Sequence, residues 1–286
     1  MATLVTEQGI VHYEAYGRGR PVLLLHGWLN SWAIWRRTIE LLGQDFRLYA
    51  LDFLGFGDSG DQSEIFSVDN FAWMVDQFME RMGILQAPLV GHSMGGTVAL
   101  THALRHPEKV TKVVVVGSPI VGSSLSPLLK LAANRGWIGL GQSTPALYRL
   151  FQLGLRSFLR VYAYFMAKDG AALGSMLTED VAKLTIAPFF ESITTLRHTD
   201  LRPQLGALAV PVLGVYGKRD IIVDPGQGHV LKAALPAAEI AWFEQAGHFP
   251  MMDQEAHFHE TIRDFLRREQ AEETGIGSLE ARPQRQ

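Results

Sequence analysis

A chain of 286 residues with 47% hydrophobic and 19% charged residues has the composition of a folded globular protein, which excludes an intrinsically disordered one. Its formal net charge of −3 gives no reason to expect nucleic acid as a partner. The absence of cysteine excludes disulfides, thiolate metal sites and a cysteine nucleophile, and it favours a reducing compartment. The first residues have neither a basic nor an apolar leader pattern, so we expect no signal peptide and a cytoplasmic location.

Short apolar runs alternate with helical patterns along the chain. Residues 4–6 and 10–15, separated by Glu7-Gln8-Gly9, predict an antiparallel hairpin at the edge of a sheet. Strands buried on both faces are predicted at 22–25, 48–51, 88–90, 113–116 and 212–216, where the runs are rich in β-branched residues or bounded by Gly and Pro. Amphipathic helices are predicted at 71–82 and 258–266. This alternation predicts an α/β fold with a mostly parallel, doubly wound sheet.

The alternation stops between residues 119 and 188, where helical patterns continue without an intervening strand. Helices are predicted at 125–134, at 145–166 with a break near Gly154, and at 173–187. We therefore predict a helical cap, residues 119–188, inserted into a core that consists of residues 1–118 and 189–268. Residues 269–286 have few apolar side chains, and we expect them to form a flexible C-terminal tail.

The strongest catalytic signal is the segment Gly91-His92-Ser93-Met94-Gly95-Gly96, which lies between a predicted strand and a predicted helix. A serine on so sharp a strand-to-helix turn is held in a strained backbone conformation with its hydroxyl exposed. Small residues two positions before and after the serine are needed because larger side chains would collide in the turn. Ser93 is therefore the predicted nucleophile, and a glycine-rich turn with a solvated serine is the simpler alternative.

A serine hydroxyl needs a base within hydrogen-bond distance, and the base needs an acid that orients it. On this type of turn the acid and then the histidine follow along the chain, each in a loop after a later strand. Asp220 follows the predicted strand at 212–216, and His248 follows another strand-like run. Both are expected at the carboxyl edge of the sheet, where ligand sites form. The predicted triad is Ser93, Asp220 and His248, with Asp224 as the competing acid.

The backbone N–H groups of Trp28 and Met94 are expected to form an oxyanion hole. Gly27 allows the backbone to turn so that the N–H of Trp28 faces the substrate, and Met94 begins the helix after the serine. His26 in the same turn is predicted to be a structural residue that forms hydrogen bonds.

His102 and His106 lie four residues apart on the predicted helix after the serine, a spacing that can hold a metal ion. With no third ligand nearby in the sequence, we predict that both are surface histidines. No metal and no cofactor is implied by the predicted chemistry.

These segments together resemble those of the α/β-hydrolase superfamily, in its capped, serine esterase or lipase-like form. The resemblance covers about residues 8–268 and rests on His26-Gly27-Trp28, on Asp52-Phe53-Leu54-Gly55-Phe56-Gly57-Asp58-Ser59, on the turn at Ser93, on Asp220 in its Gly-x-x-Asp turn, and on Gly247-His248. It implies the α/β-hydrolase fold and a serine hydrolase mechanism through an acyl-enzyme. It is much less specific for the substrate, because one fold carries many functions.

The residues around the serine separate this chain from some branches of that superfamily. Haloalkane dehalogenases and epoxide hydrolases have an aspartate where this chain has Ser93. Carbon–carbon bond hydrolases often have Asn at the position of His92 and Trp at that of Phe249, and haloperoxidase-like members also tend to differ at His92. We predict hydrolysis of carboxylic esters with small to medium, largely apolar acyl groups. Carbon–carbon hydrolysis of a diketone-like acid, or a non-catalytic small-molecule receptor on the same fold, are the alternatives.

The predicted cap has an uneven charge pattern. Residues 118–168 contain no Asp or Glu. They contain six basic residues: Lys130, Arg135, Arg149, Arg156, Arg160 and Lys168. Because the net charge of the whole chain is −3, the rest of the chain carries −9. The same segment is rich in aromatic residues. The simpler interpretation is that the aromatic side chains pack onto the core and the bases are solvated. The alternative is a cap that weakly contacts an anionic membrane surface or receives an amphiphilic substrate, which can be anionic. The oligomeric state does not follow from these features.

Overall fold

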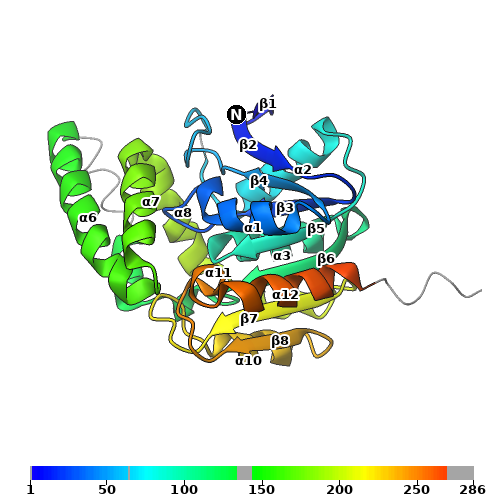
Figure 1. Ribbon diagram of the computed structural model, residues 1–286. Helices are drawn as coiled ribbons and strands as arrows, with labels where there is room; N and C mark the ends of the chain where they lie inside the picture. The colour runs from blue at the N-terminus through cyan, green and yellow to red at the C-terminus, as the bar shows by residue number, and fades with distance from the viewer. Residues whose placement is uncertain (1, 64, 134–143, 269–286) are drawn as a thin grey trace, which may run out of the picture.

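The computed structural model describes residues 2–63, 65–133 and 144–268, so the predicted tail at 269–286 lies outside the described residues. Eight strands form one sheet in the order β1-β2-β4-β3-β5-β6-β7-β8 (Figure 1). The strands are β1 (Ala2–Val5), β2 (Ile10–Tyr16), β3 (Pro21–Leu25), β4 (Arg47–Leu51), β5 (Ala87–His92), β6 (Val110–Val116), β7 (Val212–Gly217) and β8 (Glu239–Phe243). β2 pairs antiparallel with β1 and β4, and all other neighbours are parallel. The predicted fold class, with its edge hairpin, is confirmed.

Helices cover both faces of the sheet. Figure 1 shows α1 (Arg36–Leu42) and α12 (Glu255–Arg267) in front of it and α2 (Val68–Arg81) and α3 (Met94–Arg105) behind it. The other elements outside the cap are η1 (Trp32–Trp35), η2 (Pro107–Lys109), α9 (Arg202–Leu205), α10 (Gln227–Ala234) and α11 (Pro250–Asp253). The central strands are buried on both sides, which is why they appear in the sequence as unbroken apolar runs. Within the described ranges, no helix is long and apolar enough to cross a membrane.

The segment after β6 is helical and lies beyond the carboxyl ends of the parallel strands, at the left of Figure 1. In the described part of the chain it comprises η3 (Gly122–Ser124), α4 (Pro127–Ala132), α6 (Pro145–Met166), α7 (Gly170–Lys183) and α8 (Ile186–His198). These helices occupy the place predicted for the cap, and its predicted end at residue 188 falls within the first turn of α8. β5, which Ser93 directly follows, ends at the same edge, so these helices lie over the end of β5.

The helix boundaries within the cap differ from the predicted ones in three places. The first predicted helix, 125–134, is reduced to α4, and its last residue lies outside the described residues. The expected break near Gly154 is wrong: α6 is continuous, because this glycine faces open space and a single exposed glycine weakens a helix without interrupting it. The predicted helix 173–187 ends early, since Leu184 and Thr185 are extended and Pro188 is tolerated only in the first turn of a new helix.

Candidate active site

Ser93 lies on a sharp turn between β5 and α3. Its backbone has φ 51° and ψ −120°, a conformation that L-residues rarely adopt, and its N–H donates to the carbonyl oxygen of Val116 at 2.8 Å. A Cβ atom on Gly91 would collide with the carbonyl group of Gly95, and a Cβ on Gly95 would collide with the backbone at the end of β3. The glycines are therefore what allows the strand and the helix to meet at this angle.

Asp220 and His248 lie side by side in the loops that follow β7 and β8. The Nδ1 atom of His248 is 2.7 Å from Oδ2 of Asp220, and their side chains are 4% and 2% exposed. The other carboxylate oxygen, Oδ1, accepts hydrogen bonds from the backbone N–H groups of Ile222 (2.8 Å) and Val223 (3.0 Å). Because both oxygens are engaged, the carboxylate is fixed in orientation. It holds a proton on Nδ1 of His248 and leaves Nε2 free to act as a base.

The competing acid, Asp224, is exposed and its Oδ1 accepts a hydrogen bond from the N–H of Gly226 at 2.8 Å. This carboxylate stabilises its own turn. The structure therefore places Asp220, and not Asp224, against the histidine.

The loop after β3 passes directly beside Ser93. A Cβ on Gly27 would lie 3.0 Å from the Cβ of Ser93, so a larger residue at position 27 would displace the serine. The turn is closed by Asn30, whose side-chain Nδ2 donates to the carbonyl oxygen of Trp28 at 2.9 Å. Leu29 has φ 61°, and among the described residues it and Ser93 are the two non-glycine residues with positive φ. Such strain is concentrated at functional sites, and the leucine was not evident from the sequence.

The two N–H groups expected to bind an oxyanion belong to the residues that follow Gly27 and Ser93 in the chain. Met94 is the first residue of α3, so its N–H has no acceptor within the helix. In the described ranges, neither this N–H nor that of Trp28 donates to a protein acceptor. His26 supports the loop: Nδ1 donates to the carbonyl oxygen of Gly27 at 2.7 Å and Nε2 accepts from the N–H of Phe53 at 2.9 Å. Burial lowers the pKa of His26, so the ring is neutral and structural.

His92 is a supporting residue that the sequence analysis used only to compare families. It is fully buried, and its Nε2 donates to the backbone carbonyl oxygen of His248 at 2.9 Å. The centroids of the two imidazole rings are 4.7 Å apart, and the centroid of the Phe249 ring lies 4.8 Å from that of His92. Burial, with a smaller effect of His248, holds the pKa of His92 well below its ordinary value. His92 therefore fixes the loop that carries His248, and because its own ring is neutral it adds no positive charge beside His248.

Asp253 is a second supporting residue, at the end of α11. Its Oδ2 accepts a hydrogen bond from the N–H of Gly247 at 2.7 Å, and its Oδ1 accepts one from the N–H of Lys168 at 2.6 Å. One carboxylate thus connects the loop before His248 to the end of α6. The cap and the candidate base are held in register by this contact.

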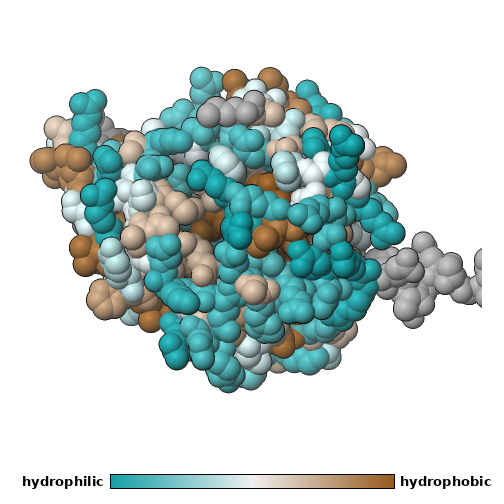
Figure 2. Space-filling model, in the orientation of Figure 1, coloured by the Kyte–Doolittle hydropathy of each residue, from teal (hydrophilic) through white to brown (hydrophobic). Residues whose placement is uncertain are grey.

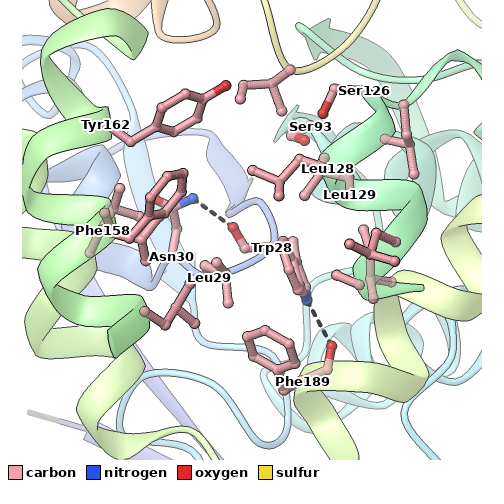
Figure 3. A pocket seen from close by; sticks show the side chains of 18 of the residues that line it. Trp28, Leu29, Asn30, Ser93, Ser126, Leu128, Leu129, Phe158, Tyr162 and Phe189 are labelled. Atoms are coloured by element: carbon pink, nitrogen blue, oxygen red, sulfur yellow. Dashed lines mark hydrogen bonds between the residues drawn. The ribbon is translucent and has the colours of Figure 1, made fainter. Parts of the chain in front are cut away.

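An apolar cavity of about 460 Å³ lies between the core and the cap, with Ser93 and His248 in its wall. Figure 3 shows Phe158 and Tyr162 of α6 reaching toward Leu128 and Leu129 of α4 across the cavity. Trp28 also lines it, and its Nε1 donates to the carbonyl oxygen of Phe189 on α8 at 3.0 Å, so this side chain joins core and cap (Figure 3). Among the described lining residues none is Lys, Arg, Asp or Glu. The cavity therefore suits an uncharged, largely hydrocarbon ligand.

The prediction that His102 and His106 are surface histidines is wrong for His102, which is fully buried. Its Nδ1 donates to the carbonyl oxygen of Ala72 at 3.1 Å, and the side chain of Asp76 on α2 completes a group that could hold a metal ion. The carboxylate of Asp76 is already paired with a cation, the ammonium of Lys109, at 2.6 Å. His102 is buried because α3 packs against α2, a contact that the spacing of the two histidines in the sequence does not indicate.

Comparison with known proteins places the chain in a family. A sequence profile described as "alpha/beta hydrolase fold" matches residues 20–167. The chain belongs to this alpha/beta hydrolase family. The chain is 30% identical over 265 residues to the pimeloyl-[acyl-carrier protein] methyl ester esterase of Aliivibrio fischeri strain MJ11, a match that covers 90% of this chain and 97% of that protein.

Solved structures of other alpha/beta hydrolases share the fold. The esterase from Exiguobacterium antarcticum superposes with a TM-score of 0.77 at 20% identity, over 93% of this chain and 99% of that one. A meta-cleavage product hydrolase from Pseudomonas fluorescens IP01 superposes with a TM-score of 0.73 at 22% identity, over 93% and 97%. At these identities the likeness establishes the fold and not the substrate.

Proposed function

We propose that this alpha/beta hydrolase is a carboxylic ester hydrolase with Ser93 as nucleophile, His248 as general base and acid, and Asp220 as the residue that orients the histidine. Oγ of Ser93 attacks the acyl carbon while Nε2 of His248 takes the hydroxyl proton. The tetrahedral intermediate collapses, and the alcohol leaves with the proton from His248. Water then attacks the acyl-enzyme by the same route and releases the carboxylic acid.

The developing oxyanion is stabilised in this proposal by the backbone N–H groups of Trp28 and Met94. Neither N–H has a protein acceptor among the described residues, and Gly27 lies against Ser93, which supports this role. The strained turn at Leu29 directly follows Trp28. A preorganised donor of this kind is worth about 10²- to 10³-fold in turnover, because it meets the charge only as it forms.

The observation that carries the proposal is that an apolar cavity is lined both by Ser93 and by His248, the histidine that is paired with Asp220. The Asp220–His248 pair at 2.7 Å, the strained backbone of Ser93 and the cavity wall all come from different parts of the chain. Relatives about 30% identical that act as ester hydrolases support the same reaction.

The substrate we propose is an ester whose acyl group is largely hydrocarbon and uncharged. A diketone-like acid carries a carboxylate, and the described lining residues supply no Lys or Arg to receive it, which argues against carbon–carbon hydrolysis of such acids. An acyl methyl ester, of the kind named for the pimeloyl-[acyl-carrier protein] relatives, has no free carboxylate at the reacting end. We propose such an ester, attached to a carrier or free, as the class of substrate, and the uncharged lining of the cavity supports this choice.

A panel of p-nitrophenyl esters of increasing acyl length tests this proposal. Each added methylene buried in the cavity contributes up to ~0.8 kcal/mol, so kcat/KM is expected to rise by up to about fourfold per carbon until the cavity is filled. Ser93→Ala is expected to lower turnover by at least ~10³-fold while the far-ultraviolet circular dichroism spectrum is unchanged. A strict preference for acetyl esters would contradict the proposal that the apolar cavity receives the acyl chain. Undiminished turnover by folded Ser93→Ala would reject the nucleophile.

A further inference from the structure

A band of apolar side chains projects from the outer surface of α6. Leu150, Leu153, Val161, Tyr164 and Phe165 are each between 57% and 69% exposed, and none of them lines the cavity. At 3.6 residues per turn they fall within one sector of about 120° of the helix. We call these five residues the α6 band. Figure 2 shows brown side chains along the left edge of the molecule, where α6 lies.

A row of arginines runs beside the α6 band. Arg149, Arg156 and Arg160 recur at helical spacing in the adjacent sector, and α6 has no acidic residue along its 22 residues. An apolar band next to a cationic row, on a helix without acids, is the pattern of a helix that lies in the interface of an anionic bilayer. A scattered, solvated surface would show acids among the bases, as the rest of this chain does.

The mouth of the cavity opens on the same side of the cap. Five residues line the cavity and are also more than a third exposed: Leu128, Leu131, Leu147, Phe151 and Phe158. The first two belong to α4 and the other three to α6, so the mouth lies between these helices. Exposed apolar surface therefore continues from the α6 band into the cavity that contains Ser93.

We propose that the α6 band and the arginine row dock onto an anionic lipid surface and turn the cavity mouth toward it. Contiguous exposed apolar surface is rare on soluble proteins and marks an interaction site. Apolar side chains that project from one exposed face of a helix suit insertion among lipid headgroups, and the arginines complement lipid phosphates. Each arginine near such a surface is worth about fivefold in affinity, the ratio that corresponds to ~1 kcal/mol. This binding goes beyond ester hydrolysis and does not depend on it.

Sedimentation with vesicles measures this binding directly. The full chain carrying Ser93→Ala is used, so that hydrolysis of lipid does not enter the measurement. We expect binding to vesicles of equal parts phosphatidylglycerol and phosphatidylcholine at low salt, weaker binding at high salt, and little binding to phosphatidylcholine alone. In the same background, Leu150→Glu with Val161→Glu is expected to abolish binding. Arg149→Gln with Arg160→Gln is expected to weaken it by about 25-fold.

Matched controls separate docking from general effects of charge and folding. Arg81→Gln changes an exposed residue at the end of α2, and Leu85→Glu changes one in the loop before β5. Both lie at the opposite edge of the sheet, and these variants should bind like the parent protein. In the wild-type background, the α6 band variant should keep its activity on a short soluble ester, because its residues do not line the cavity. Absence of binding to anionic vesicles at low salt would overturn the proposal and assign the α6 band to a protein partner. Equal binding by the band variant and the controls would also overturn it.

Discussion

Replacing Asp180 by asparagine should stabilise the folded protein, and it should do so much more at alkaline than at acidic pH. Asp180 lies on α7 of the cap and is 9% exposed, and its Oδ2 has no hydrogen-bond partner among the described residues. Burial raises the pKa of Asp180 to about 7, although a hydrogen bond from Ser31 opposes this and the charge of Asp52 adds to it. The folded protein therefore prefers the neutral acid.

The size of the effect follows from that pKa. An unfolded aspartate has a pKa of 3.8. Compared with a residue that does not ionise, Asp180 therefore lowers the free energy of unfolding by ~4 kcal/mol at about pH 8 and by ~2 kcal/mol at about pH 5, because the unfolded chain releases the proton more readily than the folded protein. The stability contributed by the neutral acid is complete below pH 3.8 and is lost as the pH rises through about 7. Asparagine does not ionise, so the stability that Asp180→Asn adds should be ~2 kcal/mol larger at about pH 8 than at about pH 5.

Urea unfolding of the wild type and of Asp180→Asn at the two pH values measures this difference, and any constant offset between asparagine and protonated aspartate cancels. Asp61→Asn, at an exposed position, is the matched control. An effect of Asp180→Asn that is the same at both pH values would refute the reasoning, because it would mean that the carboxyl ionises as readily in the folded protein as in the unfolded chain.

Three further results follow from contacts at the site and beneath it. Asp220→Asn should lower kcat by up to ~10⁴-fold and Asp224→Asn by less than about twofold; the reverse order would move the acid to Asp224. Trp28→Phe removes the hydrogen bond to Phe189 and should lower the free energy of unfolding by ~1 kcal/mol, so an unchanged urea midpoint would contradict the role given to that bond. Burial lowers the pKa of His102 to about 4, so the wild type should lose up to ~3 kcal/mol of stability between pH 6.5 and about 4. His102→Gln should not show this loss.

The sheet and the order of the candidate catalytic residues could be predicted because each depends on short segments. Ser93, Asp220 and His248 each stand in a loop that directly follows a parallel strand. Parallel strands bring their carboxyl ends to one edge, so residues far apart in sequence converge without any long-range contact being known. The apolar runs of the strands are equally local, since burial on both faces leaves no polar alternation to interpret.

The supporting contacts could not be predicted, because each joins segments whose distance in space depends on the folded chain. His92 bonds to the backbone of the His248 loop, and Asp253 bonds to the end of α6. Nothing in the neighbouring sequence of either residue indicates its partner. The boundary between α7 and α8 was missed for another reason: the helical pattern is the same on both sides, and Pro188 was the one local signal of a new helix.

Labelling with a fluorophosphonate tests the central claim most directly, because this reagent reacts covalently with a serine only when a neighbouring base activates it. Peptide mapping by mass spectrometry then locates the modified residue. We expect one label, on Ser93, which is absent in Ser93→Ala and forms at least ~10²-fold more slowly in His248→Ala. An unlabelled wild-type protein that is correctly folded, or a label on a different residue, would contradict the proposed mechanism.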